Sequence, residues 1–447
     1  MKNRIILFVC LCSMSELFAQ IQLMPLPEEG FEQRMTKYVN GLELADSHEH
    51  LMPQESVKNS TMLDFMLLLH HYADDDIKSA GMSKSQFAEL LTDKYSVEEK
   101  WKIVKPYWEV SKNTAYNRVV LLAMDELYGI SELNDKTVIE LSNAIRNSYN
   151  GDWYNHVLKE KARIKYAIMD VGSQRMEDNL FRYVEKFDQF IRINSRKNIE
   201  SVGEKYAMKI NTLDAFVVAL EKAFDEAIGR GIIGIKSTAA YHRILKYENV
   251  SEDQAIKVFN DVKNLEINEN LEFDEVKPLQ DYMMHKIIQQ ARKYNIPFQI
   301  HTGFHAGDGN YISNSNPALL TNLFLEYRDV NFLLFHGGYP YGGELAALAK
   351  SFRNIYLDMS WIYVISPSYA ERYLHEWLET VPSNKIMAFG GDYHNVENAY
   401  GHSLMARAVV AKVLIEKVRT GYLTEAEAKD IAQRILLTNV INVFGIE

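Results

Sequence analysis

Two histidines one residue apart, His48 and His50, could bind a metal ion together. They follow the apolar run of residues 41–45, which is predicted to begin a β-strand. Because successive side chains of a strand point to opposite faces, residues two apart point the same way. Imidazole is a common metal ligand, but surface histidines are also common, so the pair is a weak signal alone. Its interpretation depends on where the other polar residues fall.

Further polar side chains occur where other apolar runs stop. These residues are Arg192, Lys236, His301, His336 and Asp392. Glycines stand beside three of them, in His-Thr-Gly, His-Gly-Gly and Gly-Gly-Asp, and fit sharp turns or the close approach of a ligand. Chance would place mixtures of Ser, Asn, Asp and Gly at such ends, rather than four histidines and an aspartate. The pattern favours one metal-binding or catalytic site.

The elements that must position these residues alternate between strands and helices. Strands are predicted at residues 41–50, 162–170, 187–194, 231–236, 297–301, 331–336, 354–358 and 385–392. Helical segments such as 212–229 and 276–294 lie between them. Continuous apolar runs are typical of buried parallel strands. Eight such units predict an α/β fold, a (β/α)8 TIM barrel, whose active sites lie at the carboxyl ends of the strands.

A long helical segment, residues 51–161, follows the first predicted strand. Residues 113–128, for example, show apolar side chains at the i, i+3, i+4, i+7 spacing of an amphipathic helix. Because this insertion comes directly after His48 and His50, we expect it to cap that end of the barrel. The remaining histidines on or near helices are interpreted as surface or packing residues. They are His70, His71, His156, His285, His375 and His402.

The charge and the N-terminus limit the partners and the location. The formal charge is −11, from 49 Lys and Arg against 60 Asp and Glu, which argues against nucleic acid as a partner. Residues 1–20 combine a basic start with a short apolar stretch and predict a signal peptide, cut after Ala19 or Gln20. An N-terminal helix retained as an anchor is the alternative. We expect an exported protein, periplasmic or secreted, with no membrane association after cleavage and with residues 21–447 as one domain. Both cysteines, Cys10 and Cys12, would leave with the signal.

Together these residues resemble the amidohydrolase superfamily of metal-dependent hydrolases. The shared pattern is His-x-His on strand 1, Lys on strand 4, His on strands 5 and 6, and Asp on strand 8. The runs PFQIHTG (297–303), LFHGGYP (334–340) and NIYLD (354–358) are similar to the amidohydrolase-related (amidohydrolase 2) branch. That branch includes the amidohydrolase-like domain found ahead of glutamine-synthetase-like domains, the uronate isomerases and non-oxidative decarboxylases. The predicted export signal departs from the synthetase-linked arrangement.

The resemblance implies a mononuclear metal site with one position left for water. Its expected ligands are His48, His50, His301 and Asp392. Zinc suits imidazole and carboxylate ligands, and manganese and iron are alternatives. In a site with a second metal, Lys236 in carboxylated form and His336 would supply further ligands.

The same resemblance implies roles in catalysis. Asp392 would take a proton from metal-bound water and later hand it to the leaving group. His336 would polarise the substrate carbonyl if it does not bind a second metal. Unmodified Lys236 would bind a substrate carboxylate, with a buried ion pair as the alternative. Arg192 would clamp a carboxylate bidentately, with a salt bridge inside the barrel as the alternative, and Tyr241 would contact substrate.

Other side chains in the same loops are candidates for shaping the pocket. They are His242, His305, Asp308, Tyr339, Tyr341, Trp361 and His394. Asp46 and Asp358 are expected to orient neighbouring groups rather than to bind the metal.

Three functions remain open at this point. The first is hydrolysis of a C–N (amide-type) bond in a small carboxylate-bearing substrate. The second is a non-hydrolytic reaction on the same barrel, uronate-isomerase-like or decarboxylase-like. The third is a non-catalytic protein that binds metal or ligand, against which Asp392 argues because a pure binder needs no proton carrier. The sequence leaves open the identity of the substrate, the number of metals and whether the chain forms a homo-oligomer.

Overall fold

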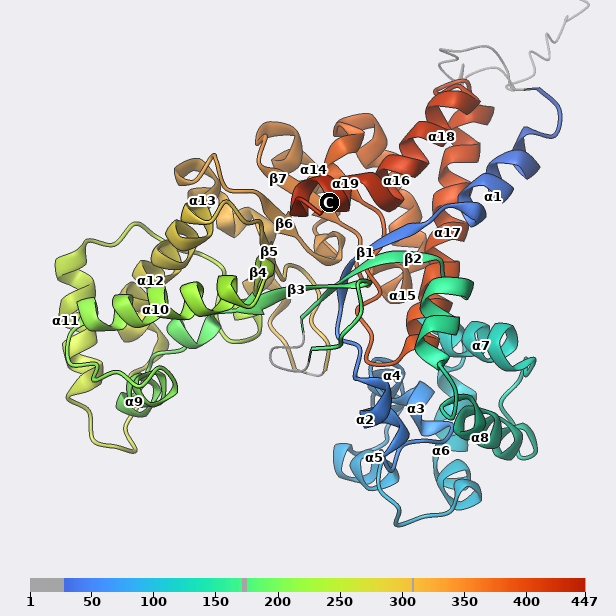
Figure 1. Cartoon of the computed structure of the whole chain (residues 1–447), viewed down its shortest axis with the longest axis horizontal. Helices are drawn as coiled ribbons and strands as arrows, with labels where there is room; N and C mark the ends of the chain where they lie inside the picture. Colours follow the sequence, from blue (N-terminus) through green and yellow to red (C-terminus); the bar gives the residue numbers. More distant parts are fainter. Residues whose placement is uncertain (1–27, 171–174, 308, 447) are drawn as a thin grey trace, which may run out of the picture.

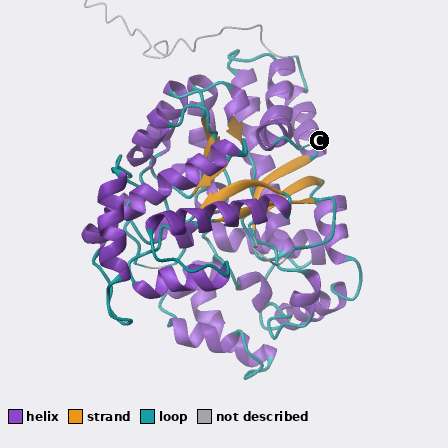
Figure 2. Cartoon of the chain, turned by 60° about the vertical axis from the view of Figure 1, so that its left-hand side comes forward, coloured by secondary structure: helices purple, strands orange, loops and turns teal. Residues whose placement is uncertain are grey.

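The computed structural model describes residues 28–170, 175–307 and 309–446, so the predicted signal peptide lies outside the described residues. Its centre is a sheet of eight parallel strands whose spatial order follows the sequence (Figure 1). The strands are β1 (Leu44–Glu49), β2 (Ile164–Met169), β3 (Phe181–Lys186), β4 (Ile232–Ser237), β5 (Phe298–Ile300), β6 (Phe332–Leu334), β7 (Ile355–Asp358) and β8 (Ile386–Met387). Helices surround them on all sides in the turned view (Figure 2). The predicted TIM barrel is confirmed.

Main-chain hydrogen bonds join the segment after β8 to β1. The main-chain nitrogen of Asp392 donates to the oxygen of His48 at 2.9 Å, and that of His50 donates to the oxygen of Tyr393 at 3.3 Å. These bonds continue the parallel pattern of the sheet past the end of β8. Barrel closure therefore places Asp392 beside the histidine pair.

The helices pack apolar stripes onto the barrel. In α10 (Leu213–Gly229), the buried residues Leu213, Phe216, Leu220 and Phe224 recur at spacings of three and four. The other outer helices are α1 (Phe31–Gly41), α9 (Arg196–Lys205), α11 (Glu252–Lys263), α12 (Phe273–Lys293), α13 (Thr321–Glu326), α14 (Gly342–Ser351), α15 (Ile362–Ile365), α16 (Pro367–Thr380), α17 (Val396–Arg419), α18 (Glu425–Gln433) and α19 (Asn439–Phe444). None of the described helices has the length and apolar character needed to cross a bilayer.

The strand predicted at residues 187–194 is wrong. The third strand is β3, and Asp188–Phe190 forms a 3₁₀ turn that follows it. Phe187, Phe190 and Ile191 are buried, but they pack under helices instead of joining the sheet. A run of apolar residues reports burial and does not by itself distinguish a strand from a buried loop.

The insertion between β1 and β2, residues 51–161, is called the cap here. It groups at the lower right of Figure 1 and contacts the barrel mainly where α7 packs on α17. Its helices are α2 (Gln54–Lys58), α3 (Met66–Leu69), α4 (Ala73–Ser79), α5 (Lys84–Leu90), α6 (Val97–Ser111), α7 (Ala115–Tyr128) and α8 (Thr137–Ser148), followed by a π-helical turn, Asn155–Lys161. The chain turns between α4 and α5 near Gly81, whose φ is +116°. The predicted insertion after strand 1 is confirmed.

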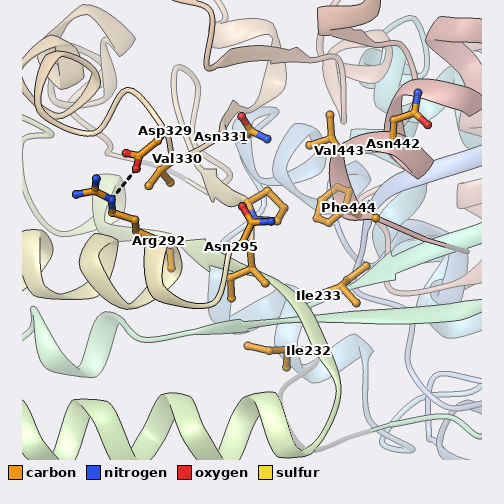
Figure 3. Close-up of a pocket in the computed structure, with 14 residues that line it drawn as sticks. Ile232, Ile233, Arg292, Asn295, Asp329, Val330, Asn331, Asn442, Val443 and Phe444 are labelled. Atoms are coloured by element: carbon orange, nitrogen blue, oxygen red, sulfur yellow. Dashed lines mark ion pairs between the residues drawn. The ribbon is translucent and has the colours of Figure 1, made fainter.

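The opposite end of the barrel holds a separate cavity of about 320 Å³ (Figure 3). It is lined by the starts of β4 and β5 and by the C-terminal helix α19, whose Phe444 lies under the strands. Arg292 and Asp329 form an ion pair of 2.6 Å at its edge. Because barrel enzymes place chemistry at the carboxyl ends of the strands, this cavity lies at the stabilising face.

Candidate active site

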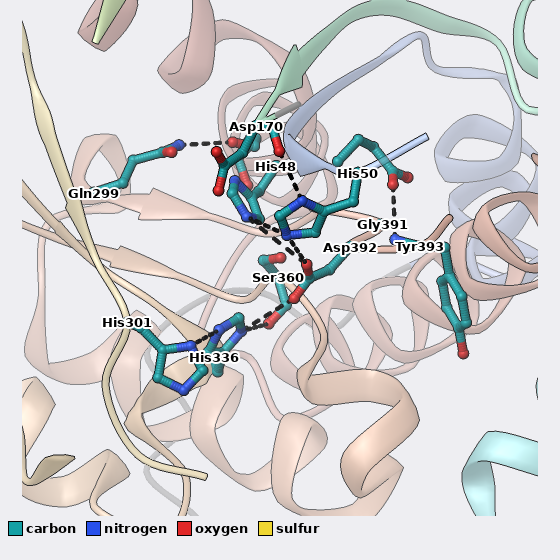
Figure 4. Close-up of polar contacts among 12 residues, drawn as sticks. His48, His50, Asp170, Gln299, His301, His336, Ser360, Gly391, Asp392 and Tyr393 are labelled. Carbon is teal, nitrogen blue, oxygen red and sulfur yellow. Dashed lines mark hydrogen bonds and ion pairs between the residues drawn. The ribbon is translucent and has the colours of Figure 1, made fainter. Parts of the chain in front are cut away.

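Three side chains converge at the end of β1 and just beyond β8 (Figure 4). His48 Nε2 lies 3.2 Å from His50 Nε2. Asp392 Oδ1 lies 3.2 Å from His50 Nε2 and 3.8 Å from His48 Nε2. His48 and Asp392 are almost fully buried, whereas 25% of the His50 side chain is exposed. These three residues, called the metal corner here, offer two nitrogens and an oxygen that suit one divalent cation.

The neighbours of the metal corner set its protonation. His50 Nδ1 donates to the main-chain oxygen of Asp170 at 2.9 Å, so the neutral ring carries its lone pair on Nε2. Although burial opposes it, the hydrogen bond and charge of Asp392 raise the pKa of His50. Burial lowers the pKa of His48. Burial also acts against ionisation of Asp392, but its hydrogen bond to His50 holds the pKa of Asp392 well below its usual range. The ionised carboxylate of Asp392 therefore favours one positive charge between itself and His50, either a proton on His50 Nε2 or a bound metal ion.

Two buried acids, Asp46 and Glu49, hold the main chain around Asp392. Asp46 Oδ1 accepts a hydrogen bond from the nitrogen of Gly391 at 3.0 Å, and Glu49 Oε2 accepts one from the nitrogen of Tyr393 at 2.8 Å. Burial raises the pKa of Asp46 to about 7 and that of Glu49 well above its usual range. The charge of Asp46 adds to the effect of burial in raising the pKa of Glu49. Both acids thus position the residues on either side of Asp392.

His301 and His336, which follow β5 and β6, form a second pair beside the metal corner. His336 Nε2 lies 2.9 Å from His301 Nδ1. Each ring also donates to a main-chain oxygen, His336 Nδ1 to Ser360 at 3.0 Å and His301 Nε2 to Phe304 at 2.8 Å. Two neutral rings have only these two protons, so the facing nitrogens both carry lone pairs. Burial lowers the pKa of His336 to about 3 and lowers that of His301, which disfavours a third proton.

This pair meets the metal corner through His336, whose Nδ1 lies 3.8 Å from Asp392 Oδ2. The facing lone pairs suit a shared cation or an electrophilic hydrogen on a ligand. His301 lies behind His336 as seen from Asp392, outside the group of three (Figure 4). Its role as a metal ligand, like that of His336, stays a prediction.

Lys236 is the penultimate residue of β4 and its side chain is a buried cation, 2% exposed. Its Nζ lies 3.4 Å from the centre of the Phe335 ring, and that ring packs edge-on against His48. Burial lowers the pKa of Lys236 to about 7. Within the part of the chain that the structure describes, no carboxylate pairs with it, so the alternative of a buried ion pair is not seen. Such an amine gains from an anion, as a substrate carboxylate would provide. A role for Lys236 in binding a second metal stays a prediction.

Tyr241 and His305 lie on the side of the site formed by the ends of β4 and β5. The ring of Tyr241 lies 4.7 Å from those of both His301 and His305. His305 Nδ1 is buried and finds no partner among the described residues. His242 is exposed, and Asp308 lies outside the described residues. Tyr241 is thus placed where a ligand of the histidine pair could reach it.

Asp358 ends β7 and holds the segment that follows. Its Oδ1 accepts hydrogen bonds from Ser47 Oγ at 3.0 Å and from the nitrogen of Ser360 at 2.8 Å. Because the oxygen of Ser360 accepts from His336, Asp358 orients that histidine through one residue. This position agrees with the orienting role predicted for Asp358.

Arg192 does not end strand 3, and that prediction is wrong because the strand itself was misplaced. Arg192 follows the 3₁₀ turn after β3 and is exposed. The end of β3 is Lys186, whose Nζ forms an ion pair of 2.9 Å with Asp170 at the end of β2. Burial and then the charge of Arg192 lower the pKa of His242, so Arg192 stands near the loop after β4. Its role as a substrate clamp stays a prediction.

Two cap residues, His71 and Tyr72, contact the loops around the metal corner. The ring of His71 stacks on that of His394 with centres 3.8 Å apart, and Tyr72 stacks on Trp361 at 4.7 Å. The Trp361 ring in turn lies 4.9 Å from that of His336. The contacts of His71 are packing contacts, one of the two roles predicted for it, although their place beside the site was not predicted. Helical periodicity carries no signal for them, because both cap residues lie in a turn between α3 and α4.

Left-handed backbone is concentrated at the site. Eight described non-glycine residues have positive φ, and five of them surround the metal corner. The five are His71 (φ +70°), Tyr72 (+78°), His336 (+62°), Trp361 (+67°) and Asp392 (+61°). This conformation costs an L-residue roughly 1–2 kcal/mol and persists only where the surroundings hold it. Strain of this kind gathers at functional sites.

Comparison with known proteins gives one family match and one partial relative. Residues 238–445 match the family model described as Amidohydrolase. The protein named fluG from Emericella nidulans is 32% identical over 171 residues, or 37% of this chain. That match spans only 20% of the Emericella protein.

Other matches extend over almost the whole chain. The uronate isomerase of Thermotoga maritima is 21% identical over 448 residues, covering 90% of this chain and 94% of that one. Its crystal structure aligns at a TM-score of 0.76 and 17% identity, over 96% of this chain and 99% of that one. A Lactobacillus casei protein, provisionally assigned as a metal-dependent hydrolase, aligns at a TM-score of 0.65 and 21% identity over 92% and 97%. At these identities the structural likeness establishes the fold and leaves the reaction open.

Proposed function

We propose that this chain, an amidohydrolase-superfamily barrel, is a metal-dependent enzyme that hydrolyses a carbon–nitrogen bond in a small carboxylate-bearing substrate. The superfamily assignment rests on the family match of residues 238–445 together with the barrel fold. The predicted likeness to domains that precede glutamine-synthetase-like domains stays a prediction.

One observation carries the proposal: donor atoms of His48, His50 and Asp392 converge within bonding reach of a single ion. The fit is chemical as well as spatial, because His50 uses its Nδ1 proton on Asp170 and turns a bare Nε2 toward Asp392. Zinc is the ion we propose, with manganese or iron as alternatives for the same donors. A bound divalent ion supplies a water of lowered pKa and polarises a carbonyl oxygen.

Asp392 is the proposed proton carrier. Its Oδ1 faces His50 and its Oδ2 faces His336 Nδ1 at 3.8 Å, so the carboxylate lies between the metal corner and the histidine pair. Because its pKa lies well below the usual range, Asp392 is ionised at neutral pH, as a proton acceptor must be. It would take the proton of the attacking water and return it to the departing nitrogen.

Lys236 and the ring-lined surroundings complete the proposed site. The buried ammonium of Lys236 would hold the substrate carboxylate, since no described carboxylate forms an ion pair with it. Trp361 packs over the histidine pair, Tyr72 stacks on Trp361, and these buried rings would keep bulk water from the pair. Exclusion of water strengthens each charge interaction in the site.

Isomerisation of a uronate is the second candidate, favoured by the likeness to uronate isomerases over nearly the full chain, cap included. Asp392 would then carry a proton between neighbouring carbon atoms of the substrate. A sugar acid needs partners for several hydroxyl groups, and the ring-rich surroundings of Trp361 offer few.

Metal content and two substrate panels test the proposal. The protein is purified without added metal, its metal is measured by mass spectrometry, and it is then incubated with aminoacyl amides and with hexuronates. One equivalent of zinc and release of amine or ammonia would support hydrolysis. Conversion of a hexuronate to its ketose, without amide hydrolysis, would replace the proposal by the second candidate. A metal-free protein inactive on both panels would overturn both.

We also propose that the chain is exported, from the basic and apolar character of residues 1–20. Cell fractionation and N-terminal sequencing test this. The mature chain should begin at Gln20 or Ile21 and leave the cytoplasm, whereas an intact Met1 in the cytoplasmic fraction would contradict export.

A further inference from the structure

His402 is a buried histidine of α17 that contacts the segment carrying Asp392. It lies in the second turn of that helix, and its side chain has no exposed surface. Its Nδ1 donates a hydrogen bond to the main-chain oxygen of Gly391 at 2.9 Å. Burial lowers the pKa of His402 to about 4, so at neutral pH the ring carries only this one proton. His402 therefore holds the main chain directly before Asp392.

The other nitrogen of His402 gains nothing from its position. Nε2 is buried and has no hydrogen-bond partner among the described residues. The rings of Tyr363, Phe389 and Tyr393 pack around it, with centres 5.7, 5.5 and 6.0 Å away. A buried lone pair that has lost water without meeting a donor is unfavourable. A phenylalanine would fill similar space without that cost, so the contribution of the imidazole is the hydrogen bond from Nδ1.

The peptide group between Gly391 and Asp392 is held at both of its polar atoms. Its oxygen accepts from His402, and its nitrogen donates to the main-chain oxygen of His48 at 2.9 Å. Among the described residues, no second hydrogen bond reaches this oxygen. Because a peptide group is planar, its rotation changes ψ of Gly391 and φ of Asp392 together. The contacts with β1 and α17 therefore fix φ of Asp392.

The two buried acids do not replace this contact. Asp46 accepts from the nitrogen of Gly391, and Glu49 accepts from the nitrogen of Tyr393. These nitrogens belong to the peptide groups before and after the one that His402 holds. His402 is thus the side chain that orients the peptide group between them.

The conformation fixed in this way is an unfavourable one. Asp392 has φ +61°, in the left-handed region, which persists only where the surroundings hold it. Rotation of the peptide group away from His402 would relieve this strain and would break the hydrogen bond to His48. The carboxylate of Asp392 would then lose its fixed position beside His50.

We propose that His402 is a positioning residue of the active site, which holds Asp392 in its left-handed conformation by donating to the oxygen of Gly391. The inference rests on the proposed function for the role of Asp392 as metal ligand and proton carrier. It adds a residue that touches neither metal nor substrate and that acts from a helix outside the barrel.

Two substitutions separate the hydrogen bond of His402 from its packing. His402→Phe keeps a ring and removes the donor, whereas His402→Asn keeps a donor near the position of Nδ1 and loses much of the ring. His402→Phe should keep its Tm within a few degrees, while zinc affinity and kcat each fall by roughly 10–100-fold, as for other groups that orient a metal ligand. His402→Asn should have a lower Tm because it leaves a cavity, yet should stay close to the unsubstituted protein in zinc affinity and kcat.

Three measurements on the full-length protein follow these effects. Chelator competition gives the zinc affinity, calorimetry gives Tm, and kinetics on the hydrolysed amide give kcat and KM, of which KM should change little. A crystal structure of metal-free His402→Phe should show a negative φ at Asp392. His285→Phe is the matched control, because His285 on α12 also contacts a main-chain oxygen, that of Glu248 at 3.2 Å, and should change neither zinc affinity nor kcat.

Two results would overturn the inference: unchanged zinc affinity in His402→Phe with a positive φ at Asp392, or equal losses of zinc affinity in His402→Phe and His402→Asn. The second result would mean that packing, rather than the donor, holds the segment. Should His402→Phe not fold, His402→Leu takes its place with the same expectations. An unsubstituted protein without zinc or amide hydrolysis would overturn the proposed function alone, since the change of φ in the metal-free variant still tests the role of His402.

Discussion

The metal corner and the stacked rings of Tyr72, Tyr116 and Trp361, called the aromatic wall, are held in place by different physical means. The metal corner is built by barrel closure, because main-chain hydrogen bonds set Asp392 beside His48 and His50. Two rings of the aromatic wall, Tyr72 and Tyr116, come from the cap, whose helix α3 is held where the side-chain amides of Asn395 and Asn398 donate to its main-chain oxygens. The position of the corner therefore follows from the fold of the barrel, whereas the position of the wall depends on how the cap docks.

Docking of the cap centres on Glu397, a buried residue in the first turn of α17. Its carboxylate accepts hydrogen bonds from the hydroxyls of Tyr128 at 3.0 Å and Tyr149 at 3.2 Å, and from Trp153 Nε1 at 2.9 Å. Burial raises the pKa of Glu397. All three donors belong to the cap. The Glu397 side chain, on the barrel helix α17, therefore fixes the cap to the barrel. Substitutions that remove the supports of the metal corner and of the aromatic wall, one at a time, test this difference.

Asp392→Asn should have the largest effect, because it removes the proton carrier of the metal corner. We expect kcat to fall by roughly 10³-fold, within the range for loss of a general base. Tm should stay within a few degrees. Steady-state kinetics on the hydrolysed amide measure the effect. Asp329→Asn, at the opposite face of the barrel, is the control and should keep full activity. Full activity of Asp392→Asn would show that another group carries the proton.

Gly391→Ala should deform the metal corner through its support. A Cβ at this position would lie 1.7 Å from Glu49 Oε1 and 3.1 Å from Asp46 Oδ2, both buried. We expect unfolding free energy to fall by about 3 kcal/mol, as for an overpacked core. Urea unfolding and zinc content measure the two losses. Gly229→Ala, where nothing lies within 4 Å of the added Cβ, should be nearly neutral. A stable, zinc-loaded Gly391→Ala protein would contradict the role assigned to the two acids.

Glu397→Ala should separate the aromatic wall from the metal corner. The substitution leaves one buried donor, Tyr149, and two half-buried donors without an acceptor, at up to about 1–3 kcal/mol each before relaxation. We expect the cap to loosen, kcat/KM to fall by roughly 10–100-fold and zinc to stay bound. Hydrogen exchange of α7 and α8, compared with that of the barrel strands, follows the cap. Glu397→Gln, which keeps one acceptor oxygen, should lose less, and exposed Glu140→Ala should lose nothing. Loss of zinc together with activity would mean that cap and corner are not separable.

The part of the site that lies on the barrel could be predicted from the sequence, because a strand ends where an apolar run gives way to polar residues. Apolar runs stop at His48, His301 and His336, and parallel strands bring their carboxyl ends to one rim. Asp392 lies five residues beyond β8, which has only two residues. The apolar run that extends to Phe389 still predicted Asp392 at the rim. The metal-ligand roles of these residues remain predictions.

The cap side could not be predicted in the same way. Tyr72 reaches the site through a left-handed turn, and Glu397 acts through three donors far away in sequence. Neither position belongs to a periodic pattern. Arg192 shows the opposite error: a buried apolar run, residues 187–194, imitated a strand and placed an exposed residue at the rim. Apolar patterning encodes burial, and only tertiary contacts decide which buried segment enters the sheet.

The smallest predicted effect concerns Lys236 and the dependence of ligand affinity on pH. Because burial lowers the pKa of Lys236 to about 7, its charge is present below that pH and is lost as the pH rises through it. A simple carboxylate such as benzoate stays ionised over this range, so its affinity should fall by about tenfold between pH 6 and pH 8 as the ammonium disappears. In Lys236→Met, the affinity for benzoate should already be low at pH 6 and should not change with pH. Lys186→Met, at the end of the neighbouring strand β3, should keep the pH dependence of the unsubstituted protein. Calorimetry from pH 6 to pH 8 measures all three proteins. An unchanged pH dependence of affinity in Lys236→Met would assign the titrating charge to another group. The metal corner, rather than β4, would then be the place where the carboxylate binds.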